Sequence, residues 1–217
     1  MAENFKMIAK TLYGMEAILS EELRKLGARD VREGVRCAFF EGDMGFMYKA
    51  NLSLRTALRI LKPIQTFQIR RQEELYSRIQ GISWDLYLDP SMTFVVDTVL
   101  HSEHFSNSLF VSQKAKDAIV DQFRDRLGER PTVSVSDPDL RIHVHLQGNT
   151  VHVSLDSSGS SLHRRGYRME TNIAPINEVL AAGSLLLSGW RGQSDFLDPM
   201  CGSGTYLIEA AMIACNI

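Results

Sequence analysis

The start of the chain alternates between strand-like and helix-like spacing of its apolar residues. A β-prone apolar run over 5–13 leads into Gly14, and the apolar residues that follow share one helical face. Those residues are Met15, Ile18, Leu19, Leu23 and Leu26. Gly27 is placed to end the helix, because glycine readily adopts the left-handed conformation of a helix C-cap. The chain therefore begins with a strand followed by a helix.

Three further elements complete this first part of the pattern. We predict a second strand over 31–41, a short helix over 44–51 and an extended segment over 58–69. Pro63 interrupts the last segment, since proline cannot donate a backbone hydrogen bond to a neighbouring strand. The pattern predicts a small α+β unit over residues 1–70.

The pattern restarts over residues 71–157. A helix is predicted over 73–82 and a buried strand over 94–100. After the candidate capping residues at 106–108, apolar side chains recur every four positions until Gly128. They are Val111, Ala115, Ile119, Phe123 and Leu127. This spacing predicts a long amphipathic helix packed on the strands around it.

A hairpin over 140–156 follows, and its two-residue Gly148-Asn149 turn determines the register. The predicted pairs are Gln147 with Thr150, Leu146 with Val151, Val144 with Val153, Ile142 with Leu155, and Arg141 with Asp156. The apolar side chains then share one face. The other face carries His143, His145 and His152, with His145 opposite His152. No cysteine or carboxylate lies beside that pair to complete a metal site, so we interpret these histidines as surface or RNA-facing.

The composition changes after the hairpin. Residues 158–170 are rich in Ser and Gly and then in Arg, which indicates a linker with a basic end. A helix from about Pro175 to Gly189, a strand over 196–198 and a glycine-rich loop come next. The segment 171–217 therefore reads as the start of another domain.

Composition and charge restrict the class of protein. The 217 residues are 44% apolar and have a formal charge of −2, which excludes a highly basic nucleic-acid coat. The three cysteines of the chain show no CxxC spacing, so neither a disulfide framework nor a zinc cluster is indicated. The uncharged stretch 179–190 is shorter than the roughly 18 residues that a membrane span needs. We expect a soluble, untargeted, cytoplasmic protein with no metal and no membrane partner.

The glycine-rich loop carries the candidate chemistry. In an α/β nucleotide fold, the first strand delivers its last residue to the ligand crevice, and the glycines after it let the backbone approach the cofactor. Asp198, Gly202 and Gly204 occupy those positions. A Gly-x-Gly match by itself is weak, because ordinary tight turns share it. The full string DPMCGSGT is more specific. It resembles the first cofactor-binding motif of class I S-adenosylmethionine-dependent methyltransferases that methylate exocyclic base amines.

Other stretches extend the resemblance over the whole chain. LHRRGYR before the loop, and IEAAMIA after it, are similar in order and spacing to bacterial THUMP-domain ribosomal RNA guanine-N2 methyltransferases of the large subunit. The opening GMEAILSEELRKLG and the helix-plus-hairpin unit resemble the ferredoxin-like and THUMP regions of that family. The implied fold is an α+β chain with a ferredoxin-like unit (1–70) and a THUMP domain (71–157). The first elements of a Rossmann-like class I methyltransferase domain (171–217) follow the linker.

The resemblance also implies roles for particular residues. Asp198, Pro199, Cys201, Gly202, Ser203, Gly204 and Thr205 would line the methionine and ribose end of S-adenosylmethionine. Cys201 reads as a small residue that fits a tight loop, not as a nucleophile. The arginines at 164, 165 and 168 would hold RNA phosphates, or else form a solvated linker. Tyr167 would stack on a base or pin the linker to a domain surface. We read Glu209 as a solvated or capping residue.

The chain also departs from the family pattern. The Asn/Asp-Pro-Pro-aromatic motif that orients the base amine is absent, so no catalytic residue is assigned. The acidic residue expected to hold the ribose would lie beyond Ile217. We therefore expect a truncated portion of an rRNA methyltransferase, with an incomplete cofactor site and no activity alone. The part from about 171 onward should be mobile, or buried against the preceding domains or a second copy of the chain.

Two other functions are compatible with the sequence. THUMP-type regions also precede other RNA-modifying domains, so one alternative is a stand-alone RNA-binding module. The string DPMCGSGT argues against those other domains as the part that follows. A DNA adenine methylase would share the same loop. The N-terminal half argues against it, because it shows no helix of the kind that reads a major groove.

Overall fold

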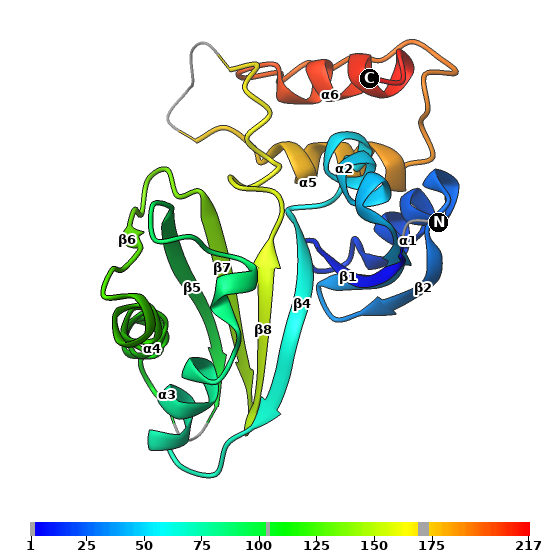
Figure 1. The fold of residues 1–217 in the computed structure, drawn as a ribbon. Helices are drawn as coiled ribbons and strands as arrows, with labels where there is room; N and C mark the ends of the chain where they lie inside the picture. The colour runs from blue at the N-terminus through cyan, green and yellow to red at the C-terminus, as the bar shows by residue number, and fades with distance from the viewer. Residues whose placement is uncertain (1–2, 103–104, 169–173) are drawn as a thin grey trace. The chain divides into compact units, whose positions relative to one another are not determined.

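The computed structural model describes residues 3–102, 105–168 and 174–217 (Figure 1). It is a mixed α/β structure that divides into two compact units. The first unit contains Met1–Ile60 and Ser160–Ile217, and the second contains Leu61–Gly159. The end of the predicted linker and the start of the predicted last domain, residues 169–173, lie outside the described residues.

The N-terminal part of the first unit alternates strands and helices. Its elements are β1 (Phe5–Lys10), α1 (Glu16–Leu26), β2 (Arg29–Gly34), β3 (Cys37–Gly42) and α2 (Met44–Ser53). Strand β3 lies between β1 and β2 and is antiparallel to both. Leu19 and Leu23 of α1 pack with Phe40 of β3 in the core. Helix α1 ends at Gly27, whose φ of 98° confirms the predicted left-handed cap.

The prediction of a single strand over 31–41 is wrong. The chain reverses at Val35 and Arg36, so that Gly34 of β2 pairs with Cys37 of β3. Arg36 has a φ of 56°, a conformation that non-glycine residues adopt mainly in turns. The β-prone composition continues across this two-residue turn, and for that reason the pattern did not reveal it.

The second unit is a sheet with helices packed against it. Its elements are β4 (Arg59–Gln68), α3 (Glu73–Gln80), the 3₁₀ helix η1 (Trp84–Leu86), β5 (Thr93–His101), α4 (Ser108–Leu127), β6 (Thr132–Val133), β7 (Leu140–Gln147) and β8 (Thr150–Asp156). Strand β4 begins at Arg59, at the end of the first unit's N-terminal segment. The strand order is β4-β8-β7-β5-β6, and β5 is parallel to both of its neighbours. The ladder of β4 and β8 is irregular between Pro63 and Gln65, where proline was expected to interrupt it.

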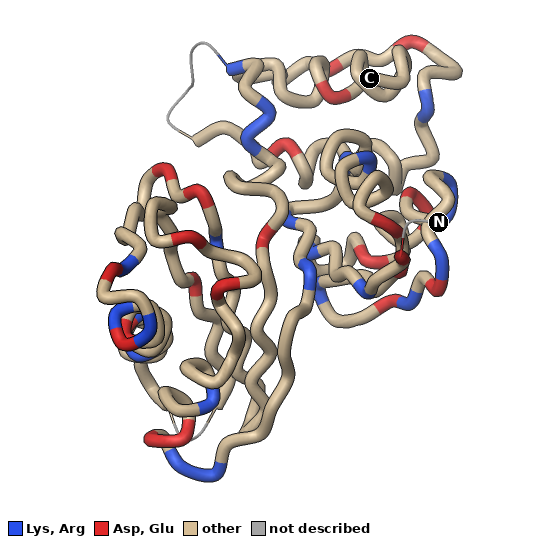
Figure 2. The backbone as a smooth tube through the Cα atoms, in the orientation of Figure 1, with Lys and Arg blue, Asp and Glu red and all other residues tan. Residues whose placement is uncertain are grey.

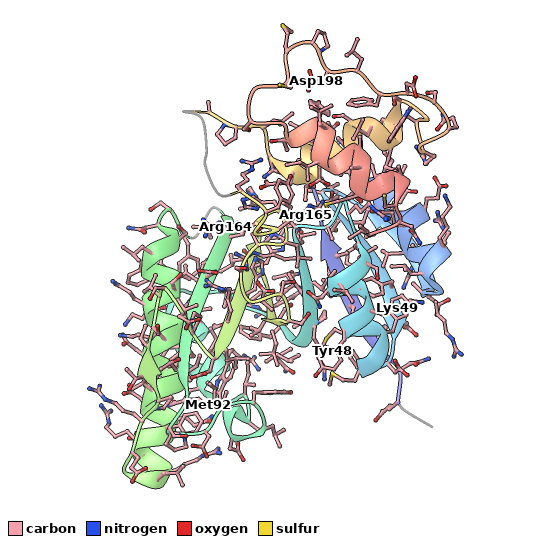
Figure 3. All side chains as sticks on the ribbon, turned by 90° about the horizontal axis from the view of Figure 1, so that it is seen from above. Tyr48, Lys49, Met92, Arg164, Arg165 and Asp198 are labelled. Carbon is pink, nitrogen blue, oxygen red and sulfur yellow. The ribbon has the colours of Figure 1, made fainter. Side chains whose placement is uncertain are left out.

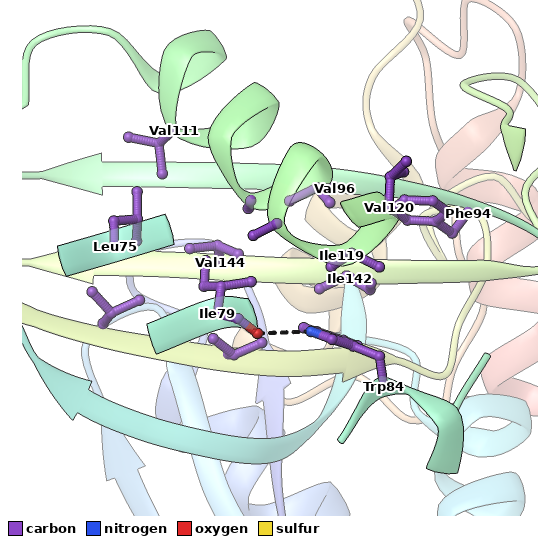
Figure 4. Packing of buried hydrophobic residues seen from close by; sticks show 14 of the residues in the cluster. Leu75, Ile79, Trp84, Phe94, Val96, Val111, Ile119, Val120, Ile142 and Val144 are labelled. Carbon is purple, nitrogen blue, oxygen red and sulfur yellow. Dashed lines mark hydrogen bonds between the residues drawn. The ribbon is translucent and has the colours of Figure 1, made fainter. Parts of the chain in front are cut away.

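Helices α3 and α4 pack together, and α4 covers β5 (Figure 4). The apolar stripe predicted for α4 is buried at Val111, Ala115, Ile119 and Phe123, whereas Leu127 in the last turn is exposed. Trp84 fills the space beside α3 and α4, and its indole Nε1 donates a hydrogen bond to the Ile79 carbonyl at 2.8 Å. A buried tryptophan thus satisfies its single donor.

The predicted hairpin register is confirmed at every predicted pair, from Gln147 with Thr150 to Arg141 with Asp156. Its apolar side chains enter the core, and its histidines lie on the opposite face. His145 stacks on His152, with ring centroids 5.9 Å apart. Within the described ranges, no three histidine, cysteine or acidic side chains come together as a candidate metal site.

The chain returns to the first unit with α5 (Glu178–Leu187) and α6 (Thr205–Ala214). The Asn177 side chain caps α5 by accepting a hydrogen bond from the Val179 amide, so the helix starts slightly after the predicted Pro175. Helix α5 packs on α1 at Gly183, where an added Cβ would clash with the Met15 sulfur. Of the alternatives predicted for this part of the chain, burial against the preceding elements is seen for α5, whereas most of residues 191–202 are exposed.

The strand predicted over 196–198 does not form in the part of the chain that the structure describes. A strand requires a neighbour that pairs with its backbone, and the described residues supply none for this segment. Phe196 packs on Trp190 instead, with ring centroids 5.4 Å apart, beside the small core that joins α5 and α6. In the same described ranges, no helix is both long and apolar enough to cross a membrane.

Candidate cofactor loop and linker ion pairs

The segment before α6 forms a tight glycine loop. Gly202 and Gly204 have φ values of 54° and 74°, a region where a residue with a Cβ is strained. The Gly204 amide donates to the Cys201 carbonyl at 2.7 Å, and the Asp198 carboxylate accepts from the Met200 amide at 3.1 Å. The two glycines and these local hydrogen bonds turn the chain directly into the helix.

Helix α6 starts with its first-turn amides directed toward the loop. The first hydrogen bond within the helix runs from the Ile208 amide to the Gly204 carbonyl, and Gly204 supplies no side-chain cap. Amides of a first turn have no acceptor within their own helix, and the helix dipole favours electron-rich ligand groups there. The loop leaves Pro199, Cys201 and Gly202 exposed and buries Thr205. A glycine loop that opens onto a helix N-terminus is the arrangement by which nucleotide-binding folds approach a cofactor.

A buried ion pair lies on the inner side of α6. Arg165 Nε is 2.8 Å from Glu209 Oε1, and the Arg165 and Glu209 side chains are only 13% and 0% exposed. The Tyr167 hydroxyl donates to the same oxygen at 2.9 Å. Arg165 also donates to the carbonyl of Arg55 at 2.7 Å, which connects the linker to the N-terminal part of the first unit. The interpretation of Glu209 as a solvated residue is wrong.

The pKa shifts of Glu209 and Tyr167 are consistent with their burial beside Arg165. Burial raises the pKa of the Glu209 carboxyl, and the Arg165 guanidinium opposes that rise. Burial, together with the nearby Glu209, also raises the pKa of the Tyr167 hydroxyl. Tyr167 thus stays protonated and remains a hydrogen-bond donor to the carboxylate.

Arg168 joins the beginnings of both C-terminal helices. Its Nε lies 3.1 Å from Glu178 Oε1 in the first turn of α5, where a carboxylate is favoured by the helix dipole. Its Nη2 donates to the Ile176 carbonyl, and also to the Thr205 hydroxyl at 3.1 Å. One guanidinium therefore connects the linker, α5 and the last residue of the DPMCGSGT motif.

The structure separates the four predicted RNA-binding residues into two groups. Arg165, Tyr167 and Arg168 direct their polar ends onto glutamates, whereas Arg164 is exposed. Figure 2 shows the basic positions of this segment, and Figure 3 shows Arg164 and Arg165 on it, with Asp198 on the loop before α6. The candidate cofactor residues lie together in one loop, which Arg168 contacts at Thr205.

The sequence interpretation missed Glu178 and Glu209 as partners of the linker. A signal was present, because each is the only charged residue of an otherwise apolar helix, EVLAAGSLLL and TYLIEAAMIA. A carboxylate in such a helix is buried only when a cation reaches it. Thr205, Glu209 and Ile213 are also four residues apart and share one buried face of α6.

Family models match three successive parts of the chain. They are the RlmL ferredoxin-like domain over 6–61, the THUMP domain over 70–156 and the RMKL-like methyltransferase domain over 165–217. This combination places the chain in the class of THUMP-containing methyltransferases, the resemblance that its motifs predict.

Individual proteins that the chain resembles are also described as methyltransferases or methylases. The chain is 44% identical over 209 residues to the ribosomal RNA large subunit methyltransferase K/L of Cellvibrio japonicus. The matched region covers 94% of this chain and 28% of that protein. A solved structure from Listeria monocytogenes, assigned as an N6-adenine-specific DNA methylase, has 32% identity and a TM-score of 0.86. SMU.472, assigned as a methyltransferase and solved in complex with SAH, has 34% identity and a TM-score of 0.83. Each solved match covers 99% of this chain and 56% of the other. The chain thus spans under a third of the Cellvibrio relative.

Proposed function

We propose that this chain supplies RNA binding and one end of S-adenosylmethionine binding in an rRNA methyltransferase that acts on an exocyclic base amine, guanine N2. The observation that carries the proposal is the DPMCGSGT loop, whose two left-handed glycines lead into the open first turn of α6. The rRNA methyltransferase named above and the SAH complex of a similar structure support it.

The loop residues divide the binding task. When bound, the cofactor supplies the activated methyl group. Gly202 and Gly204 allow the backbone to approach it, and the Asp198 carboxylate and the Ser203 and Thr205 hydroxyls supply polar groups. Pro199 and Cys201 shape the turn that connects Asp198 to Gly202. These seven residues, at 198, 199 and 201–205, form the proposed cofactor contact.

RNA binding is assigned to the linker and to the THUMP region. Exposed Arg164 is available to a phosphate. Arg165, Tyr167 and Arg168 stay predicted RNA contacts, and in the present arrangement they hold the segment that presents Arg164. We retain the division into 1–70, 71–157, 158–170 and 171–217 as the proposed domain organisation.

We further propose that these 217 residues alone transfer no methyl group. The sequence contains no Asn/Asp-Pro-Pro-aromatic motif to hold a base amine. Binding of RNA and transfer to it are therefore expected to separate experimentally.

The similar Listeria structure, assigned as an N6-adenine-specific DNA methylase, favours one second candidate. A DNA adenine methylase would use the same loop and a different nucleic acid. The THUMP match over 70–156 favours RNA over DNA.

Calorimetric titration of S-adenosylmethionine tests the cofactor assignment, with this chain compared to a version extended through a complete catalytic domain. In the form that binds, Asp198→Ala should weaken binding about tenfold, the usual effect of losing one charge-assisted hydrogen bond. Exposed Asp195→Ala, three residues away, is the matched control and should leave binding unchanged. Equal loss in both variants, or no binding by either length, would remove the loop as the cofactor site.

Methyl transfer from labelled cofactor by the extended form then separates the substrates. Label in guanine N2 of large-subunit rRNA supports the first proposal. Label in adenine of duplex DNA would replace it by the second. Transfer by the 217-residue chain itself would contradict its proposed inactivity.

A further inference from the structure

The sheet of the second unit has a polar face opposite the helices. Strand register aligns its side chains in rows that cross β4, β8, β7 and β5. One row is Gln68, Thr150, Gln147 and His101, and the next is Thr66, His152, His145 and Val99. The core of the unit, with α3 and α4, lies on the other side. We call these two rows the imidazole face.

One ring of this face, His145, lies beside two others. His145 stacks on His152 at 5.9 Å, and His101 meets His145 edge to face at 6.2 Å. The Thr66 hydroxyl lies 3.1 Å from His152 Nδ1, which fixes that ring. Imidazole planes surrounded by amide and hydroxyl groups match the needs of unstacked bases, which combine a flat π surface with hydrogen-bonding edges.

Charge at one end of the face complements a nucleic-acid backbone. Arg70 and Arg71 follow Ile69 at the end of β4 and are exposed, and Figure 2 shows basic positions on the turn between β4 and α3. Arg71 Nε also lies 3.7 Å from Glu74 Oε1 of α3. The Ile69 amide donates to the Asn149 carbonyl at 2.9 Å, which brings this turn beside the hairpin turn. The hairpin turn and His101 line a hollow of about 270 Å³. Further along the sheet, Arg141 neutralises Asp97 at 2.7 Å, so that carboxylate does not repel phosphates.

We propose that the imidazole face binds single-stranded RNA, with bases stacked on His101, His145 and His152 and phosphates directed to Arg70 and Arg71. The proposal rests on the RNA-binding role proposed above and names its surface and the strand form. Single strands fit because a shallow sheet with ring side chains reads exposed bases, while an A-form duplex keeps its bases stacked.

Fluorescence anisotropy of this chain with a labelled single-stranded RNA of about 12 nucleotides, within the usual site size, tests the proposal. The double variant His145→Ala/His152→Ala should weaken binding at least about 30-fold, as expected when stacking on two rings is lost. His145→Phe/His152→Phe keeps the π surfaces and should retain most of the affinity. Arg70→Ala/Arg71→Ala should weaken binding and reduce its salt dependence.

Two controls isolate the face. Gln113→Ala changes an exposed position of α4, and Arg130→Ala removes an exposed charge elsewhere in the unit, so both should bind as the unaltered chain does. Unaltered affinity in the histidine-to-alanine variant overturns the proposal, as does equal loss in the phenylalanine variant. A duplex of the same sequence that competes equally well also overturns it.

The imidazole ring protons of the unaltered chain provide a second measurement, in case the alanine variant does not fold. Addition of the RNA should shift them upfield, and unchanged resonances contradict the assignment. RNA binding that is lost only in Arg164→Ala would reject the imidazole face and leave the proposed function intact. No RNA binding by the unaltered chain would reject both.

Discussion

At the scale of single residues, the ion pair of Arg165 and Glu209 shows how context decides a role. Removing two charges from water is costly, and the pair offsets that cost only while both members are present. The Tyr167 hydroxyl adds a hydrogen bond to the same carboxylate. The folded state is therefore less stable with either residue alone than with both residues or with neither.

Arg165→Met should lower the free energy of unfolding by about 3 kcal/mol, because it leaves the Glu209 carboxylate buried without its cation. Chemical denaturation at neutral pH measures the change. Arg164→Met, the exposed neighbour, should alter stability by no more than about 0.5 kcal/mol. Equal effects of the two substitutions would mean that the ion pair contributes nothing.

The same variant should show a characteristic pH dependence. Burial raises the folded-state pKa of Glu209 above its unfolded value, so the contribution of this carboxyl is fully present below the unfolded pKa. It is lost as pH rises through the folded-state pKa. Arg165 opposes the rise, so Arg165→Met should enlarge the loss. Its destabilisation should be smaller near pH 4, about the unfolded pKa of a glutamate, than at neutrality. A penalty independent of pH would contradict this account.

At the scale of elements, α5 depends on a close approach to α1. Gly183 faces Met15, which is itself almost fully buried at the start of α1. Glycine normally weakens a helix interior, so its presence in α5 is explained by the space it leaves for the neighbouring side chain.

Gly183→Ala should therefore destabilise the first unit by about 1–3 kcal/mol, the usual cost of overpacking, despite alanine's higher helix propensity. The double variant Met15→Ala/Gly183→Ala should be less destabilised than the sum of the single substitutions, as thermal denaturation would show. Ser184→Ala, the next position of α5, serves as the control. Strict additivity would show that the two residues do not contact each other.

At the scale of the whole molecule, each unit has its own core. Ile119 belongs to the core of the second unit, and Leu19 belongs to a core of the first unit. The first unit is assembled from both ends of the chain. Separate cores allow separate cooperative transitions.

Calorimetry should therefore resolve two transitions that respond to different substitutions. Ile119→Ala should lower only one of them and Leu19→Ala only the other, each through a loss of about 2–5 kcal/mol from a fully buried site. A single transition that both substitutions lower equally would show that the chain unfolds as one unit.

Local chemistry made much of this protein predictable from its sequence. The Gly148-Asn149 turn determined the hairpin register, because a two-residue loop leaves only one pairing that keeps apolar side chains together. The four-residue spacing from Val111 to Phe123 determined which face of α4 is buried. The string DPMCGSGT indicated a glycine loop before a helix, since both glycines adopt conformations that other residues avoid.

Only the tertiary structure decided what depends on partners distant in sequence. The segment 196–198 has strand-like residues, yet it forms no strand among the described elements, because pairing requires a neighbouring backbone. Glu209 is the only charged residue of α6, and the helix sequence does not identify its partner. It is buried because Arg165 and Tyr167, more than 40 residues earlier, fold back onto it. Burial of a charge is a property of the pair and its surroundings, and a lone charge in an apolar helix does not reveal which distant cation reaches it.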